Sequence, residues 1–87
     1  MRDLPVPQTA AEWDELASKI IRANLQIAGL NYVQLGEALT AMGIRQDNKI
    51  ISGKLRAGRF SAAFFLQALV AIGVVELRLP VPKGPAV

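Results

Sequence analysis

The sequence predicts an all-α protein of four short helices. Of its 87 residues, 52% are hydrophobic and 20% are charged, a composition that favours a folded domain with its own core over a disordered chain. Apolar residues recur at helical spacing in four segments. Each of these segments ends at a glycine, namely Gly29, Gly43, Gly58 and Gly73. Glycine is a typical helix stop because it adopts the left-handed conformation without a steric cost.

A chain of this length forms one domain. We expect a helix-turn-helix domain over residues 9–79, an extended N-terminal arm over residues 1–8, which hold two prolines, and a disordered tail over residues 80–87. Met1–Pro7 does not resemble a signal peptide, and no apolar run approaches the roughly 20 residues of a membrane span. We therefore expect a cytoplasmic protein without contact to a membrane.

The first helix is predicted over residues 10–28. Thr9 and Glu12 have the spacing of a capping box at its start. Its apolar stripe is Trp13, Leu16, Ala17, Ile20, Ile21, Ala23, Leu25 and Ala28. We expect Trp13 and the three phenylalanines, Phe60, Phe64 and Phe65, to lie in the core.

The second helix is predicted over residues 32–42, with Asn31 and Gln34 as a second capping box. Gly43 ends it, and Ile44 follows as an expected core residue in the turn. Gly36 is expected where this helix crosses the next one, because a larger side chain there would push the two helices apart.

The third helix is predicted over residues 46–57 and ends at Gly58. Ile51 and Leu55, four residues apart, should face the core. Gly53 in mid-helix costs up to about 1 kcal/mol relative to alanine. It marks either a packing gap or a place where the backbone must approach a partner closely.

The fourth helix is predicted over residues 62–72, capped by Ser61, and is apolar almost all round. Such a helix lies at the centre of a core or in a dimer interface. The alternating segment Val74–Leu79 then has the pattern of a short C-terminal β-strand. It pairs with Leu4–Val6, pairs with its twin in a homodimer, or is an extended tail. We expect a homodimer through the fourth helix and Val74–Leu79, which truncation after Gly73 would dissociate.

Basic residues concentrate in one part of the chain. Between residues 45 and 59 there are five bases and one acid, Asp47, whereas the first 44 residues carry five acids and three bases. Such segregation indicates a polyanionic partner at one face.

A short helix, a glycine turn and a second, basic helix followed by a hydrophobic one make up a helix-turn-helix plan. The order Tyr32–Leu39, Gly43-Ile44, Ile51 and Arg56-Ala-Gly58 resembles the Cro/repressor-type DNA-binding domains of phages and bacteria. This resemblance implies a compact helical bundle, sequence-specific DNA binding and usually a dimer.

A closer resemblance covers most of the chain, roughly residues 13–79. Asn31-Tyr32 through Leu79, and especially Gly58–Gln67 with Ala71–Val74, is similar to a bacterial family known as domain of unknown function 6471. That family implies no activity. The chain also departs from the repressor pattern, in which the small residue and the turn glycine lie four residues apart. Gly36 and Gly43 lie seven apart, so the second helix is longer or the turn wider.

The expected DNA contacts are of two kinds. A helix fits the major groove, where side chains read base edges and others bind phosphates. The expected base contacts are Gln46, Lys49, Ile50, Gly53 and Arg56. The expected phosphate contacts are Asn31, Tyr32, Gln34, Arg45, Lys54 and Arg59. Alternatively, the charged residues form a solvated surface, Ile50 belongs to the core, and Asn31 only caps its helix.

The leading interpretation is a sequence-specific, double-stranded-DNA-binding transcriptional regulator that acts as a dimer. The alternative is a protein-interaction module, an adaptor or antitoxin, on a repressor-like fold. We expect no enzyme, no cofactor and no metal site. The chain has no histidine and no cysteine, which removes the commonest general base, the thiol nucleophile and Cys/His metal sites.

Overall fold

The computed structural model describes residues 6–79 and contains four helices within that range. They are α1 (Ala10–Ala28), α2 (Tyr32–Ala41), α3 (Asn48–Ala57) and α4 (Ala62–Ile72). The predicted all-α class is confirmed. Residues 1–5, which make up most of the predicted arm, and the whole predicted tail, 80–87, lie outside the described range.

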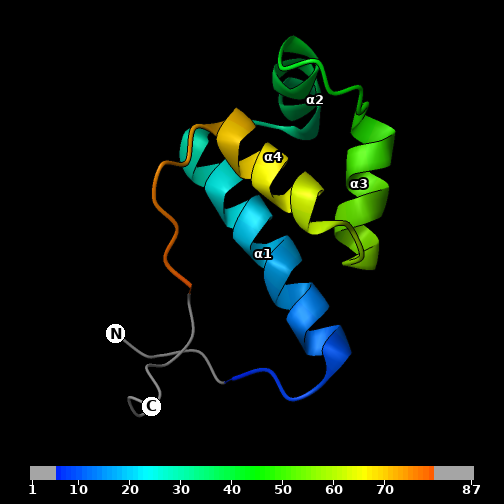
Figure 1. The fold of residues 1–87 in the computed structure, drawn as a ribbon, viewed down its shortest axis with the longest axis vertical. Coiled ribbons are helices and arrows are strands. Elements are labelled where there is room, and N and C mark those ends of the chain that lie inside the picture. Colours follow the sequence, from blue (N-terminus) through cyan, green and yellow to red (C-terminus); the bar gives the residue numbers. More distant parts are fainter. Residues whose placement is uncertain (1–5, 80–87) are drawn as a thin grey trace.

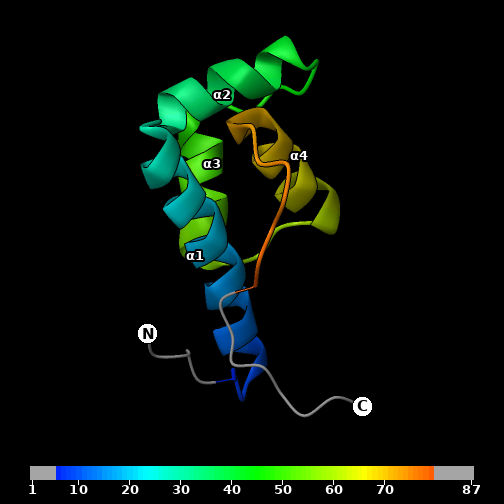
Figure 2. The same cartoon turned by 90° about the vertical axis from the view of Figure 1, so that its left-hand side faces the viewer.

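The helices form a bundle in which α4 packs against both α1 and α2, and α3 packs against α2 and α1. Figure 1 shows α1 running along the length of the molecule, with α4 beside its upper part and α3 at the right-hand edge. Turned by 90°, the same bundle shows α2 lying across its top (Figure 2). Each helix contributes to a single core, whose buried side chains are Ile20, Ile21, Leu25, Leu35, Leu39, Ile51, Leu55, Phe64, Ala68 and Leu69.

The bounds of α1 and α4 are as predicted, whereas α2 ends one residue early and α3 begins two residues late. Asp47 caps α3, because its carboxylate accepts a hydrogen bond from the Ile50 N–H at 2.9 Å. Gln46 therefore lies in the connection before α3 and not on the helix. Six residues separate α2 from α3, more than the three or four of a compact helix-turn-helix. Of the two explanations for the glycine spacing, the wider turn is the one observed.

The capping boxes are found in one full and one partial form. Asn31 Oδ1 accepts from the Gln34 N–H at 2.8 Å, and Gln34 Oε1 accepts from the Asn31 N–H at 2.9 Å. At α1, Thr9 accepts from the Glu12 N–H, but the Glu12 carboxylate accepts from the N–H of Gln8 in place of Thr9. Both helices thus start where predicted, with their first N–H groups satisfied by side chains.

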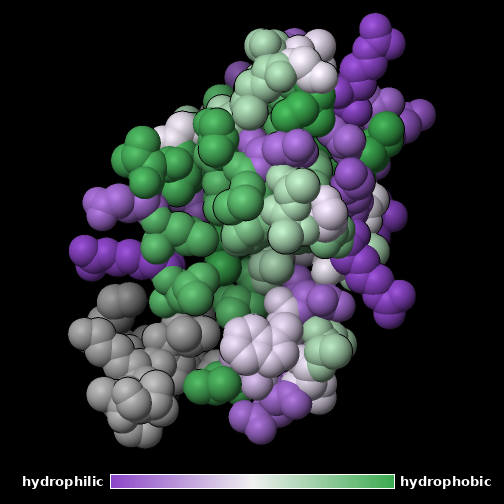
Figure 3. All heavy atoms as spheres, in the orientation of Figure 1, coloured by the Kyte–Doolittle hydropathy of each residue, from purple (hydrophilic) through white to green (hydrophobic). Residues whose placement is uncertain are grey.

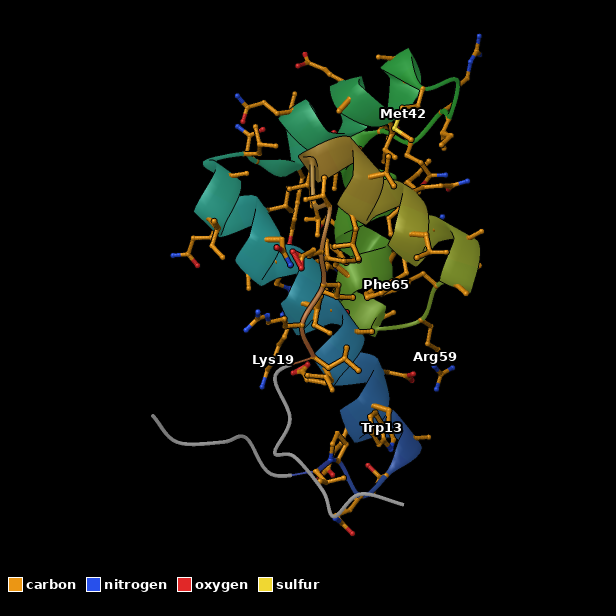
Figure 4. The ribbon with its side chains drawn as sticks, turned by 60° about the vertical axis from the view of Figure 1, so that its left-hand side comes forward. Trp13, Lys19, Met42, Arg59 and Phe65 are labelled. Atoms are coloured by element: carbon orange, nitrogen blue, oxygen red, sulfur yellow. The ribbon has the colours of Figure 1, made fainter. Side chains whose placement is uncertain are left out.

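The prediction that Trp13 is buried is wrong. Its side chain is 50% exposed, because the first turns of α1 extend beyond the other helices, as Figures 1 and 4 show. Phe64 is fully buried, with Phe60 and Phe65 partly buried and packed against the core. Ile44 also packs against the core, as predicted.

The predicted C-terminal strand is not formed. Val74–Leu79 contains neither helix nor strand. Val74 N–H donates to the Leu69 carbonyl at the end of α4, and the backbone of residues 75–79 bonds to no other described segment. A strand needs a partner for its backbone groups. Of the two predicted partners, Leu4–Val6 lies mostly outside the described residues, and pairing with a second copy stays a prediction.

Within residues 6–79, none of the helices combines the length and the apolar composition that crossing a bilayer requires.

Candidate nucleic-acid interface

The outer face of α3 is a narrow strip of exposed positions. Ile51 and Leu55 are buried, as predicted, with exposures of 0% and 1%. Lys49, Gly53 and Arg56 are exposed, and their spacing of four and three residues puts them on one side of the helix. Of the five predicted base-contacting residues, α3 therefore groups these three, with the 46%-exposed Ile50 at their border.

Gly53 leaves this strip open. A Cβ added at this glycine would have no neighbour within 4 Å, so packing inside the protein does not require glycine here. The packing-gap explanation is therefore wrong. What glycine provides is bare helix backbone between the Lys49 and Arg56 side chains, which a partner could approach closely.

Gln46, the fifth predicted base contact, is placed differently from the prediction. It lies in the α2–α3 connection, partly buried, and its Oε1 atom is buried without a hydrogen-bond partner among the described residues. Its backbone oxygen faces α2, where a Cβ added at Gly36 would lie 2.7 Å from it. Gly36 is thus the small residue that the close approach needs: its tightest neighbour is the connection, and Ile51 Cδ1 of α3 would lie 3.6 Å from the added Cβ.

A groove of about 720 Å³ separates α2 from the start of α3. Its lining comprises Val33, Gly36, Glu37, Thr40, Arg45, Gln46, Asp47, Asn48 and Ile50. Two carboxylates and one guanidinium give this lining a net charge of −1. Such a groove does not suit a phosphate, so a polyanion would have to lie along the exposed strip of α3 and not within the groove.

The predicted phosphate contacts are scattered. Arg45 and Arg59 are exposed and lie in the connections before and after α3. Figure 4 shows Arg59 projecting away from the bundle, on the opposite side from Lys19 of α1. Lys54 does not project freely, because its Nζ lies 4.4 Å from the centre of the Phe64 ring. That cation–π contact holds the ammonium over α4.

The start of α2 holds the other three predicted phosphate contacts. The reciprocal capping box uses the side-chain oxygens of Asn31 and Gln34 as acceptors and their backbone N–H groups as donors. Their amide NH₂ groups are the donors that remain for a phosphate. Tyr32 is partly buried and borders a second, smaller hollow of about 290 Å³ with Arg22 and Gln26 of α1. These residues are not part of the α3 strip.

The C-terminal end of α3 is held by α1 through polar contacts that sequence reasoning missed. The Leu55 carbonyl accepts from Ser18 Oγ at 2.8 Å and from Arg22 Nη2 at 2.9 Å. The Arg22 guanidinium also offsets the partial negative charge of the helix end. A Cβ added at Gly58 would lie 3.1 Å from the Asp14 Cβ, so the end of α3 approaches the α1 backbone closely.

A sequence signal for this contact exists. Asp14, Ser18 and Arg22 recur every four residues and form a polar line beside the apolar stripe of α1. Ser18 is 0% exposed, and a polar group so placed in a buried stripe requires a partner. The partner was not predictable, because the Leu55 carbonyl is 37 residues away in the chain.

Hydrophilic and hydrophobic side chains occupy different parts of the surface. In Figure 3, hydrophilic side chains gather along the edge where Figure 1 places α3, whereas hydrophobic ones spread over α4 and the segment after it. Residues 60–75 contain no charged residue, and Leu66 and Val70 on α4 are each 60% exposed. Among residues 6–79, no three acidic side chains come together as a metal site.

Comparison with known proteins gives one family. No curated protein and no solved structure matches the chain. The family model described as Domain of unknown function (DUF6471) matches residues 13–77, a range that begins in the first turn of α1 and includes α2, α3, α4 and most of the segment after α4. Since this match covers well over half of the sequence, the chain belongs to the DUF6471 family.

Proposed function

We propose that the protein is a sequence-specific DNA-binding regulator whose α3 helix enters the major groove of double-stranded DNA in a bacterial cytoplasm. The observation that carries the proposal is the exposed strip Lys49–Gly53–Arg56 on a helix fixed at both ends. An α-helix fits the major groove, and arginine and lysine pair there with guanine.

The strip has the features that such a contact needs. Its two bases flank a glycine whose backbone is open, so the helix axis can come close to base edges. Arg45 and Arg59 lie exposed in the two connections beside α3, where they suit phosphate contacts. Arg56 rests against its own helix through a 3.3 Å contact from Nη2 to Ser52 Oγ, a weak bond that a stronger acceptor on guanine would replace.

The test begins with selection of bound sequences from a random pool of duplexes. The affinity for the enriched duplex is then measured by fluorescence anisotropy at several salt concentrations. We expect the logarithm of the association constant to fall with the logarithm of the salt concentration, by about 0.9 for each neutralised phosphate. Arg56→Ala should weaken binding roughly 10- to 100-fold and relax preference at one base pair.

A pair of matched variants distinguishes a specific effect of α3 from a general effect of the protein's net charge. Lys49→Glu and Lys19→Glu make the same charge change, but Lys19 is exposed on α1 (Figure 4). We expect Lys49→Glu to abolish specific binding and Lys19→Glu to have at most a small, uniform effect. An absence of any enriched sequence, or equal losses in the two variants, would overturn the proposal and favour a protein-interaction module.

A further inference from the structure

We propose that Val75–Leu79 pairs antiparallel with the same segment of a second copy, in a two-fold register centred on Leu77. Val74 closes α4, since its N–H donates to the Leu69 carbonyl at 2.9 Å. Beyond it, the backbone of residues 75–79 bonds to no other described segment. Backbone N–H and C=O groups that have no partner among residues 6–79 are what an added strand would bind.

The side chains of this segment complement themselves. In an antiparallel pair centred on Leu77, each Glu76 lies opposite the Arg78 of the other copy, so opposite charges face each other twice. Both residues are exposed. Any register shifted by two residues loses both charge pairs, so the two charges select the centred register.

The apolar side chains obey the same symmetry. Val75, Leu77 and Leu79 alternate along the segment and share one face when it is extended. Their exposures are 96%, 39% and 59%. In the centred register Val75 lies opposite Leu79 and Leu77 meets its own copy, so six exposed apolar side chains form one continuous face.

A second copy also suits the surroundings of the segment. The chain carries a net charge of +3, so two copies repel each other over most orientations. Residues 60–75, which include α4, contain no charged residue, and α4 exposes Leu66 and Val70. Figure 3 shows this hydrophobic surface continuing from α4 over the segment that follows it. Two copies can therefore meet here without opposing like charges.

Charge reversal tests the register. The mass of the full-length protein is measured by sedimentation equilibrium without DNA, so failure here leaves the proposed DNA binding untouched. We expect the unaltered chain to be a dimer, and Glu76→Arg and Arg78→Glu each to be monomeric at the same concentration. The double variant Glu76→Arg/Arg78→Glu should restore the dimer, and Glu37→Arg on α2 should leave it unchanged.

A second measurement fixes the centre of the pair. The chain has no cysteine, so Leu77→Cys introduces a single thiol that would lie opposite its twin, within disulfide range. Treatment with oxidised glutathione should convert this variant to a covalent dimer. Val75→Cys is the more exposed site, but its twin lies roughly 14 Å away in this register and should remain monomeric in a denaturing gel.

Three results would overturn the proposal. They are a monomeric unaltered chain at high micromolar concentration, a double variant that stays monomeric while its fold is intact by circular dichroism, and equal crosslinking at positions 75 and 77.

Discussion

Helices α3 and α4 are close in length and adjacent in the chain, yet they are held in the fold in opposite ways. In α4 three residues are buried, Phe64, Ala68 and Leu69, and the helix packs on both α1 and α2. In α3 only Ile51 and Leu55 are buried, and the remaining contacts are concentrated at its two ends. The difference shows that α4 is fixed along its length by hydrophobic burial, whereas α3 is fixed by two core side chains and two polar or backbone contacts.

Because of this difference, the outer face of α3 takes no part in the core. Lys49, Gly53 and Arg56 lie outside the core, so burial does not explain their identity. The outer face of α4, with Leu66 and Val70, is apolar and carries no charge. The two faces therefore suit different partners, a polyanion at α3 and an apolar surface at α4.

The largest expected effect is a difference in stability between substitutions on the inner and the outer side of α3. Ile51→Ala should lower the free energy of unfolding by about 2–5 kcal/mol, because it empties a fully buried site. The neighbouring Ile50→Ala should cost about 1 kcal/mol or less, because half of that side chain is exposed. Urea unfolding followed by circular dichroism measures both, and comparable losses would show that α3 is not held by one side only.

An intermediate effect concerns the N-terminal end of α3. Gly36→Ala should destabilise the fold by about 1–3 kcal/mol, because its Cβ would lie 2.7 Å from the Gln46 carbonyl oxygen, a backbone atom. Gly53→Ala is the matched control in a second helix. It meets nothing and should stabilise the fold by about 0.5–1 kcal/mol.

The Gly53→Ala variant also sharpens the proposed function. If the α3 backbone approaches DNA at Gly53, the more stable variant should bind the selected duplex less tightly. Thermal unfolding and fluorescence anisotropy on the same sample give both values. A variant that gains stability and keeps full affinity would show that DNA does not approach this position.

The smallest effect concerns the C-terminal end of α3. Ser18→Ala should cost about 1 kcal/mol, because the Leu55 carbonyl keeps its bond from Arg22. Ser18→Ala/Arg22→Ala should cost more than the sum of the single changes, since the carbonyl then loses both donors. Lys19→Ala, next to Ser18 but exposed, should stay within about 0.5 kcal/mol of the unaltered chain. Additive losses in the double variant would mean that Leu55 is not a shared acceptor.

Local sequence signals predicted the helices well. Capping residues and glycines marked the bounds of α1 and α4, and the apolar spacing of Ile51 and Leu55 identified the buried side of α3. These features depend on residues within a few positions of one another. They are therefore readable from the chain without its partners.

Features that depend on distant segments were not predictable. The exposure of Trp13 depends on how far α1 extends beyond the other helices, and Lys54 is drawn onto Phe64 of another helix. The start of α3 is different, because it depends on a local signal that the prediction missed: Asp47 caps the helix, so Gln46 precedes it. Among the predicted base contacts, the structure brings together only those whose positions follow from helical spacing. These are Lys49, Gly53 and Arg56.

The anchoring of α3 at both ends also bears on how it would bind anything. At its start, Gly36 lets the preceding connection lie directly against α2. At its end, the Leu55 carbonyl is bound by two side chains of α1. A helix fixed in this way has little conformational entropy left to lose when a ligand arrives. The backbone that carries the exposed strip is pre-organised, so a contact made there would cost the ordering of side chains but not the ordering of the helix.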